Sequence, residues 1–146
     1  MRFRPRKLLQ LHNTSQIRFK LIVYIFLGRI RTIAWNPTGQ LIATGSADRT
    51  LRIWNPERAQ VKYSTDLRGH TAGIEKVLFN PVRDSELASC SSDGTVRFWD
   101  VRSKTCVSRL DVGGEAFTLS WSADGSTMVV GRKVRRAPLS LYRVDK

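Results

Sequence analysis

Two ten-residue segments of the chain are near-copies of one another and lie 45 residues apart. The first is SADRTLRIWN at 46–55, and the second is SSDGTVRFWD at 91–100. Five of the ten positions are identical, and the apolar residues at the other strand positions are exchanged only for other apolar residues. Repetition at this period indicates a chain built from stacked copies of one small structural unit, each burying the apolar face of its neighbour.

Short runs of β-branched and aromatic residues extend the repeat upstream of both segments. IRTIAWNPTGQLIATG at 30–45 corresponds to IEKVLFNPVRDSELASC at 74–90, and a third copy begins with AFTLSWSADGSTMVVG at 116–131. Runs of this composition, bounded by turn residues, are typical of strands. The turns NPTG at 36–39, DG at 93–94 and SADG at 122–125 suit hairpins, because glycine accepts a positive φ. No stretch has the apolar spacing of an amphipathic helix, so we expect an all-β chain of antiparallel strands.

The second copy opens with Gly69-His70 and closes with Trp99-Asp100. With a period in the low forties, this frame resembles the WD40-repeat family. The resemblance implies a β-propeller built from four-stranded antiparallel blades. The chain would then hold an incomplete propeller, with about two full blades and a broken third.

The repeat divides the chain into three parts. Residues 1–29 form a basic tail with an atypical strand segment, residues 30–131 contain the repeats, and residues 132–146 form a basic segment that departs from the pattern. The repeats themselves are expected at 30–68, 69–112 and, in part, 113–131.

The pattern fails on both sides of the repeats. KLIVYIFLG at 20–28 lies where a loop with Gly-His is expected, while Val134 replaces the turn aspartate and Ser140 the tryptophan of the third copy. Pro138 interrupts the last expected strand, since proline cannot donate to a central ladder. A propeller closes with about 4–8 blades. We therefore expect a chain that comes from a gene model reading through intron sequence or from a truncated gene, and that aggregates, or depends on a partner, when expressed alone.

The resemblance also implies a hydrogen-bonded chain of side chains in the second copy. Its members would be His70, Ser89, Asp93 and Trp99, with Ser91 as a less favoured alternative to Ser89. A buried indole N–H needs an acceptor, and a hydroxyl can accept from it while donating to an imidazole. When fully satisfied, such a network stiffens the structure around it.

The first copy keeps only part of this set. It retains Asp48 and Trp54, but Phe26 falls where the histidine is expected. Together with Gly69 and Asp100 of the second copy, Asp48 and Trp54 define the repeat.

A catalytic interpretation of the same residues is possible. His70, Ser89 and Asp93 could form a Ser-His-Asp triad, but triads are identified by geometry and environment, and no nucleophile elbow or oxyanion loop is visible. We favour the structural role. Gly113-Gly114 lacks the lysine and hydroxyl residue of a phosphate loop, and no cysteine–histidine cluster suggests a metal. We expect no catalytic, cofactor or metal site and no small-molecule substrate.

The net charge of +13 lies outside the repeats. Residues 32–131 hold 11 basic and 11 acidic side chains, whereas residues 1–31 hold eight basic and no acidic ones. Residues 132–146 hold six basic residues and one acid. If RNA binds directly, the basic tails would therefore make non-specific contacts with its phosphates.

Compartment signals are weak. The apolar run LIVYIFL at 21–27 has seven residues, far short of the roughly 20 that a membrane helix needs. It also makes a poor signal peptide, and we interpret the N-terminal segment as a solvated basic tail in preference to a mitochondrial presequence. Cys90 is expected to be a small buried apolar residue. With Cys106 as the only other cysteine, the chain suits a reducing compartment. Because the apolar run is short, the chain is not expected at a membrane.

A narrower resemblance covers residues 30–133. The junction DVRSKTC at 100–106, the following Gly114-Glu115 and the segment WSADG at 121–125 are similar to WD-repeat subunits of the THO/TREX mRNA export complex, particularly the fungal form. This resemblance implies a non-catalytic scaffold for nuclear mRNP assembly, with other THO/TREX-like subunits as partners and no cofactor. Two alternatives remain: a WD-repeat adaptor in signalling or ubiquitin ligation, in the cytoplasm or nucleus, and an RNA-binding protein that uses its basic tails.

Overall fold

The computed structural model describes residues 29–57, 65–133 and 139–143 and contains only strands and turns in those ranges. The expected all-β class is confirmed. The strands are β1 (Ile30–Trp35), β2 (Ile42–Ser46), β3 (Leu51–Trp54), β4 (Thr65–Leu67), β5 (Ile74–Phe79), β6 (Glu86–Ser91), β7 (Thr95–Asp100), β8 (Thr105–Asp111), β9 (Ala116–Trp121), β10 (Thr127–Arg132) and β11 (Leu139–Arg143).

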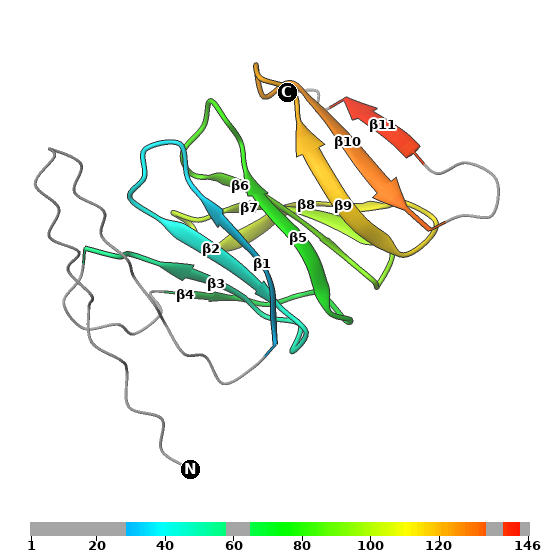
Figure 1. Ribbon diagram of the computed structural model, residues 1–146, viewed down its shortest axis with the longest axis horizontal. Coiled ribbons are helices and arrows are strands. Elements are labelled where there is room, and N and C mark those ends of the chain that lie inside the picture. The colour runs from blue at the N-terminus through cyan, green and yellow to red at the C-terminus, as the bar shows by residue number, and fades with distance from the viewer. Residues whose placement is uncertain (1–28, 58–64, 134–138, 144–146) are drawn as a thin grey trace, which may run out of the picture.

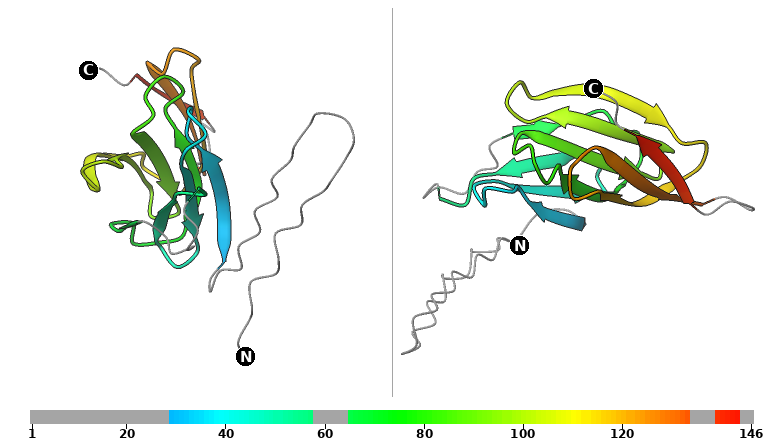
Figure 2. Two further views of the ribbon diagram at one scale, coloured as in Figure 1. Left: turned by 90° about the vertical axis from the view of Figure 1, so that its left-hand side faces the viewer. Right: turned by 90° about the horizontal axis from the view of Figure 1, so that it is seen from above.

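These strands form three antiparallel sheets, each a simple up-and-down succession (Figure 1). Blade 1 comprises β1 to β4, blade 2 comprises β5 to β8, and blade 3 comprises β9 to β11 within the described residues. The first strands β1, β5 and β9 are neighbours in space, so the sheets stack face to face in chain order (Figure 2).

Two apolar cores lie between successive blades. The core between blades 1 and 2 contains Leu51, Ile53, Val77 and Trp99, all at most 5% exposed. Full burial of one such side chain contributes about 1.5–3 kcal/mol. Alternation along the strands places one face of each sheet in one core and the opposite face in the next.

The second core joins blades 2 and 3. It includes Val96, Leu119, Met128 and Val130, together with Cys90. The expectation of a buried Cys90 is confirmed, since its side chain is fully buried. Burial raises the pKa of the Cys90 thiol to about 12, so the thiol stays protonated at neutral pH and behaves as a small apolar group.

The hairpin turns follow from their sequences. Gly39, Gly94 and Gly125 have φ angles of +70°, +81° and +67°, as their turns require. The side-chain oxygen of Asn36 accepts hydrogen bonds from the backbone N–H groups of Gln40 and Leu41, both at 2.9 Å, and so fixes the first turn.

The C-terminal segment adds a strand despite its departure from the repeat in sequence. β11 pairs with β10 from Thr127↔Arg143 to Gly131↔Leu139, and Ser140 lies opposite Val130. Strand pairing needs backbone donors and acceptors and no motif side chain, so β10 gains a neighbour without the turn aspartate or the tryptophan. The sequence boundary at residue 131 falls inside β10. Val134, Pro138, Phe26 and the segment 20–28 lie outside the described residues.

Candidate functional site: a buried hydrogen-bonded chain in blade 2

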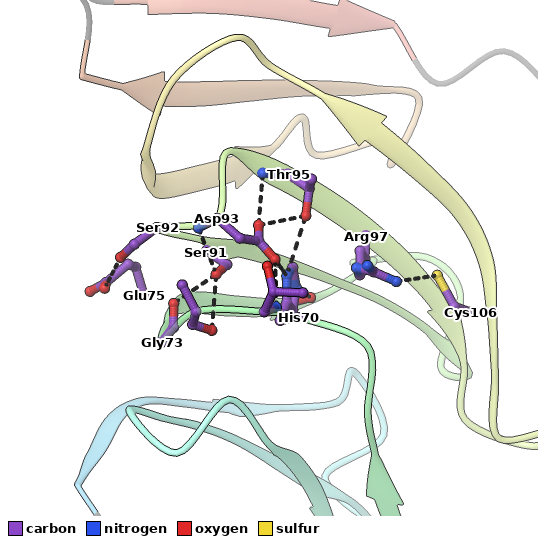
Figure 3. Close-up of polar contacts among 12 residues, drawn as sticks. His70, Gly73, Glu75, Ser91, Ser92, Asp93, Thr95, Arg97 and Cys106 are labelled. Atoms are coloured by element: carbon purple, nitrogen blue, oxygen red, sulfur yellow. Dashed lines mark hydrogen bonds and ion pairs between the residues drawn. The ribbon is translucent and has the colours of Figure 1, made fainter.

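The four side chains predicted to interact in the second repeat come from four different elements. His70 lies in the connection between β4 and β5, and Ser89 lies in β6. Asp93 occupies the turn between β6 and β7, and Trp99 lies in β7. Figure 3 shows His70 and Asp93 at the centre of the polar contacts. A contact among the four thus fastens the incoming loop to the second and third strands of its blade.

The structure joins these residues in one directed series of hydrogen bonds. The indole N–H of Trp99 donates to Ser89 Oγ at 2.8 Å. Ser89 Oγ lies 2.7 Å from His70 Nε2, and His70 Nδ1 lies 2.8 Å from Asp93 Oδ2. Because Ser89 has one proton to donate and Asp93 is a carboxylate, the series assigns the imidazole proton to Nδ1 and leaves Nε2 as the acceptor. Every polar group in the series then has a partner.

Burial and hydrogen bonding set the charge of this site. Burial raises the pKa of Asp93, but hydrogen bonds from Thr95, His70 and the backbone of Thr71 outweigh it and bring the pKa to about 2. Burial also lowers the pKa of His70 below its usual 6.5, more than the neighbouring Asp93 raises it. At neutral pH the site therefore holds a neutral imidazole and an ionised carboxylate.

Two contributors to the site were not predicted from the sequence. Thr95 Oγ donates to Asp93 Oδ1 at 2.7 Å and its backbone N–H donates to the same oxygen at 2.9 Å (Figure 3). The backbone N–H of Thr71 donates to Asp93 Oδ2 at 3.0 Å. The shared threonine of the two ten-residue segments was the available signal for Thr95, since an identical polar residue beside a turn aspartate is well placed to cap it.

Ser91, the alternative to Ser89, has a different role. Its hydroxyl donates to the carbonyl of Gly73 at 2.8 Å and accepts from the backbone N–H of Asp93 at 3.1 Å. Ser91 thus fixes the loop before β5 against the turn after β6, while Ser89 occupies the centre of the series.

The remaining repeat-defining residues of blade 2 shape its ends. A Cβ atom on Gly69 would lie 2.7 Å from Arg97 Nη1, the far end of a flexible side chain, and 3.4 Å from the ring of Trp99, an ordinary van der Waals contact. Asp100 ends β7, and its Oδ1 accepts the backbone N–H of Arg102 at 2.8 Å, which starts the turn to β8.

Blade 1 contains a shorter version of the site. The indole of Trp54 donates to Thr44 Oγ1 at 2.9 Å, as that of Trp99 does to Ser89. The Asp48 carboxylate accepts from the backbone N–H of Thr50 at 3.0 Å and from Arg52 Nη2 at 3.0 Å. Burial raises the pKa of Asp48, but these hydrogen bonds and those of the Thr50 and Ser46 hydroxyls outweigh it and lower the pKa to about 2.

The order Ser89–His70–Asp93 matches the connectivity of a hydrolytic triad, but the environment does not suit a nucleophile. Ser89 is fully buried, and its hydroxyl oxygen already accepts the proton of Trp99. A nucleophile must come within reach of a substrate atom and accept its charge near an oxyanion site. The geometry therefore supports the structural role of this network.

Within the described ranges, no group of three or more histidine, cysteine, aspartate or glutamate residues could hold a metal ion. In the same part of the chain, no helix is long and apolar enough to cross a membrane.

Known proteins resemble the chain over the segments that build these blades. The family model for the WD domain, G-beta repeat, matches residues 22–55 and 61–100. THO complex subunit 3 of Arabidopsis thaliana is 33% identical over 107 residues, covering 72% of this chain and 34% of that protein. DDB1- and CUL4-associated factor 6 of Homo sapiens is 34% identical over 101 residues, covering 68% of this chain and 12% of that protein. The chain thus spans about a third or less of these two relatives.

A solved structure agrees in fold. A chain in the crystal structure of the mitotic checkpoint complex superposes with a TM-score of 0.71 at 21% identity, covering 80% of this chain and 37% of that one. Stacked four-stranded antiparallel sheets, the Trp-Ser-His-Asp series and the matching family model lead to one conclusion: this chain belongs to the WD40 repeat family, and its sheets form part of a WD40 propeller.

Proposed function

We propose that the chain is a non-catalytic protein-interaction scaffold in nuclear mRNP assembly and mRNA export, acting with THO/TREX-like subunits. WD40 repeats are typical of interaction scaffolds, because a rigid stack of blades presents many loops without requiring chemistry at any of them. The observation that carries the narrower proposal is the 33% identity to THO complex subunit 3 over 72% of the chain. The proposed compartment is the nucleus.

The hairpin between β7 and β8 is the surface we assign to partner contact. It contains the DVRSKTC junction on which the THO/TREX resemblance depends. Its residues 102–104 are exposed, and the side chain of Arg102 is 73% exposed while paired with Asp84 at 3.2 Å. Lys104 has a φ of +61° in this tight turn, and the residue is exposed. A partner with an acidic surface fits this hairpin.

A second candidate function is an adaptor role in ubiquitin ligation. The 34% identity to DDB1- and CUL4-associated factor 6 supports it, over nearly the same share of the chain. Direct RNA binding through the basic tails is a third possibility, supported by the location of the net positive charge.

Affinity purification of the tagged full chain, with quantitative mass spectrometry, separates these functions. The main proposal expects THO subunits to co-purify stoichiometrically and to remain after nuclease treatment, because the contact is between proteins. Arg102→Glu with Lys104→Glu should reduce that recovery several-fold. The matched control is Arg49→Glu, which alters an exposed cation in the β2–β3 turn.

Other outcomes would contradict the proposal. Recovery of cullin-linked ligase subunits in place of THO subunits would favour the adaptor role. Loss of all partners on nuclease treatment, with RNA affinity that falls steeply with salt, would favour RNA binding by the tails.

A further inference from the structure

Two arginines lie opposite one another on the outer strands of blade 2. Arg97 of β7 is paired in register with Arg109 of β8, and the side chains of directly opposite residues project from the same face of a sheet. Arg97 is partly buried, and Arg109 is exposed. Because like charges directly opposite one another destabilise a sheet, an anion placed between the two guanidinium groups would be favourable.

Blade 1 shows how an anion is held at the equivalent position. Arg52 corresponds to Arg97, and the residue opposite Arg52 is Asp66. One carboxylate oxygen of Asp66 lies 3.4 Å from Arg52 Nε, and the other lies 2.9 Å from Arg68 Nη2. A single carboxylate thus bridges two guanidinium groups in blade 1. In blade 2 the position of that carboxylate is occupied by Arg109.

The donors of Arg97 lack strong acceptors. Among the described residues, no carboxylate forms an ion pair with Arg97 or Arg109, and the buried Nε of Arg97 has no hydrogen-bond partner. Arg97 Nη1 has Cys106 Sγ as its acceptor at 4.0 Å (Figure 3), and a cysteine sulfur is a weak acceptor. The next acid along β8, Asp111, instead accepts the backbone N–H of Gly113 at 2.9 Å.

We propose that Arg97 and Arg109 bind the dianionic phosphate group of a phosphate monoester. Their two positive charges match the charge of about −1.5 to −2 that a monoester carries at neutral pH. A phosphate diester of a nucleic-acid backbone carries a single negative charge, so it matches the pair less well. Guanidinium groups donate paired hydrogen bonds to phosphate oxygens. The phosphate would take the place that the Asp66 carboxylate has in blade 1.

The position is open to a phosphate group attached to a larger molecule. β8 is the outer strand of blade 2, and β7 is its one neighbour among the described strands. Residues 105–109 of β8 are all exposed. The molecule that carries the phosphate can therefore extend along this edge while its phosphate contacts the two arginines.

An NMR titration of the ¹⁵N-labelled full chain with inorganic phosphate, at constant ionic strength, tests the proposal. The Nε–Hε resonance of Arg97 should shift until it saturates, because this buried group would gain an acceptor. Arg109→Gln should weaken phosphate binding by about tenfold or more, because it removes charge-assisted hydrogen bonds. Arg109 is exposed, so circular dichroism should show that the variant is folded.

The matched control is Arg49→Gln. It removes one exposed cation from the turn between β2 and β3, so the net charge falls by the same amount while phosphate affinity should stay unchanged. Arg109→Asp is a second disruptive variant, which places a carboxylate opposite Arg97 as in blade 1. It should abolish phosphate binding and should shift the Arg97 Nε–Hε resonance without any added anion.

Two further probes distinguish the sources of such a group. They are a short glycine–serine peptide with one phosphoserine, and uridine monophosphate. Both should bind in a manner sensitive to Arg109→Gln. Tighter binding of the peptide indicates a phosphorylated protein segment as the ligand, and tighter binding of uridine monophosphate indicates a nucleotide.

Three outcomes would overturn the proposal. The first is the absence of a saturable shift at Arg97, and the second is an equal loss of phosphate affinity in Arg49→Gln and Arg109→Gln. The third is tighter binding of an oligouridylate without terminal phosphates than of either monoester, lost in Arg109→Gln, which would indicate a nucleic-acid backbone. No partner protein is present in these titrations, so their results leave the proposed export role to its own test.

Discussion

Blades 1 and 2 share a turn aspartate and a strand tryptophan, yet they use the aspartate differently. In blade 2 the Asp93 carboxylate holds a histidine whose side chain is fully buried. In blade 1 the Asp48 carboxylate, 35% exposed, pairs with Arg52, whose side chain is 17% exposed. Exposed ion pairs contribute about 0.2–1 kcal/mol, whereas removal of one partner from a buried polar network costs several times more. The turn aspartate therefore stabilises its blade more where it is hydrogen-bonded to a histidine.

The arginines that follow extend this contrast. Arg52 lies opposite Asp66 on the neighbouring strand and pairs with it at 3.4 Å. The corresponding Arg97 lies opposite Arg109, and its nearest polar contact among the described hydrogen bonds is Cys106 Sγ at 4.0 Å. Blade 2 thus gains a buried network while its outer strands carry two like charges in register.

The largest expected effect comes from His70→Ala. The variant leaves the Asp93 carboxylate and the Ser89 hydroxyl without their shared partner inside the protein, and it should lower the free energy of unfolding by about 3 kcal/mol. Urea unfolding, followed by tryptophan fluorescence, measures the loss. A loss of unfolding free energy below that of a typical surface substitution would show that the aspartate of blade 2 stabilises its blade no more than that of blade 1.

Ser89→Ala and Thr44→Ala compare the two hydroxyls that receive an indole proton. Ser89 joins both Trp99 and His70, so its removal should cost about 2–3 kcal/mol, while Thr44, bonded to Trp54, should cost about 1–2 kcal/mol. The same urea unfolding experiment ranks them. Thr44→Ser retains the hydroxyl and serves as the control for lost methyl packing. Equal costs for the two alanine variants would contradict the comparison.

Acid should destabilise the chain in two steps. The pKa of His70 is lowered on folding, so the unfolded chain takes up its proton first, and stability should fall as pH drops below about 6.5. The pKa values of Asp48 and Asp93 are both lowered to about 2, so their contributions persist above about 3.8 and disappear as pH falls toward 2. Unfolding free energies across pH should show both steps in the wild type and only the lower one in His70→Gln.

Arg109→Asp should give the smallest effect, with the opposite sign. It would place an acid opposite Arg97, as Asp66 lies opposite Arg52, and it should raise the free energy of unfolding by about 0.2–1 kcal/mol. The buried Nε of Arg97, which has no hydrogen-bond partner among the described residues, would then have an acceptor nearby. Thermal unfolding at low and high salt measures the gain, which should shrink as salt screens the pair. Destabilisation at low salt would refute this interpretation.

The repeat predicted the fold better than it predicted the partners within it. Period, strand composition and turn glycines were sufficient for the antiparallel sheets and for the burial of Cys90, because these follow from local geometry. Thr71 contributes through its backbone N–H. Every residue except proline carries this group, so the residue type does not predict the contact. The pairing of Arg52 with Asp48 depends on which donor lies near the carboxylate in the folded blade. The formation of β11 depends on backbone pairing alone. Such features arise from tertiary proximity and leave little trace in residue identity.

The two cysteines differ in exposure, so labelling of their thiols can report transient opening of the structure. Cys106 is exposed, so a thiol reagent should modify it at once in the folded protein. Cys90 is sealed between blades 2 and 3, and the reagent can reach it only during transient separation of those sheets. The slow labelling phase of Cys90 would therefore time the opening of that interface without any engineered probe.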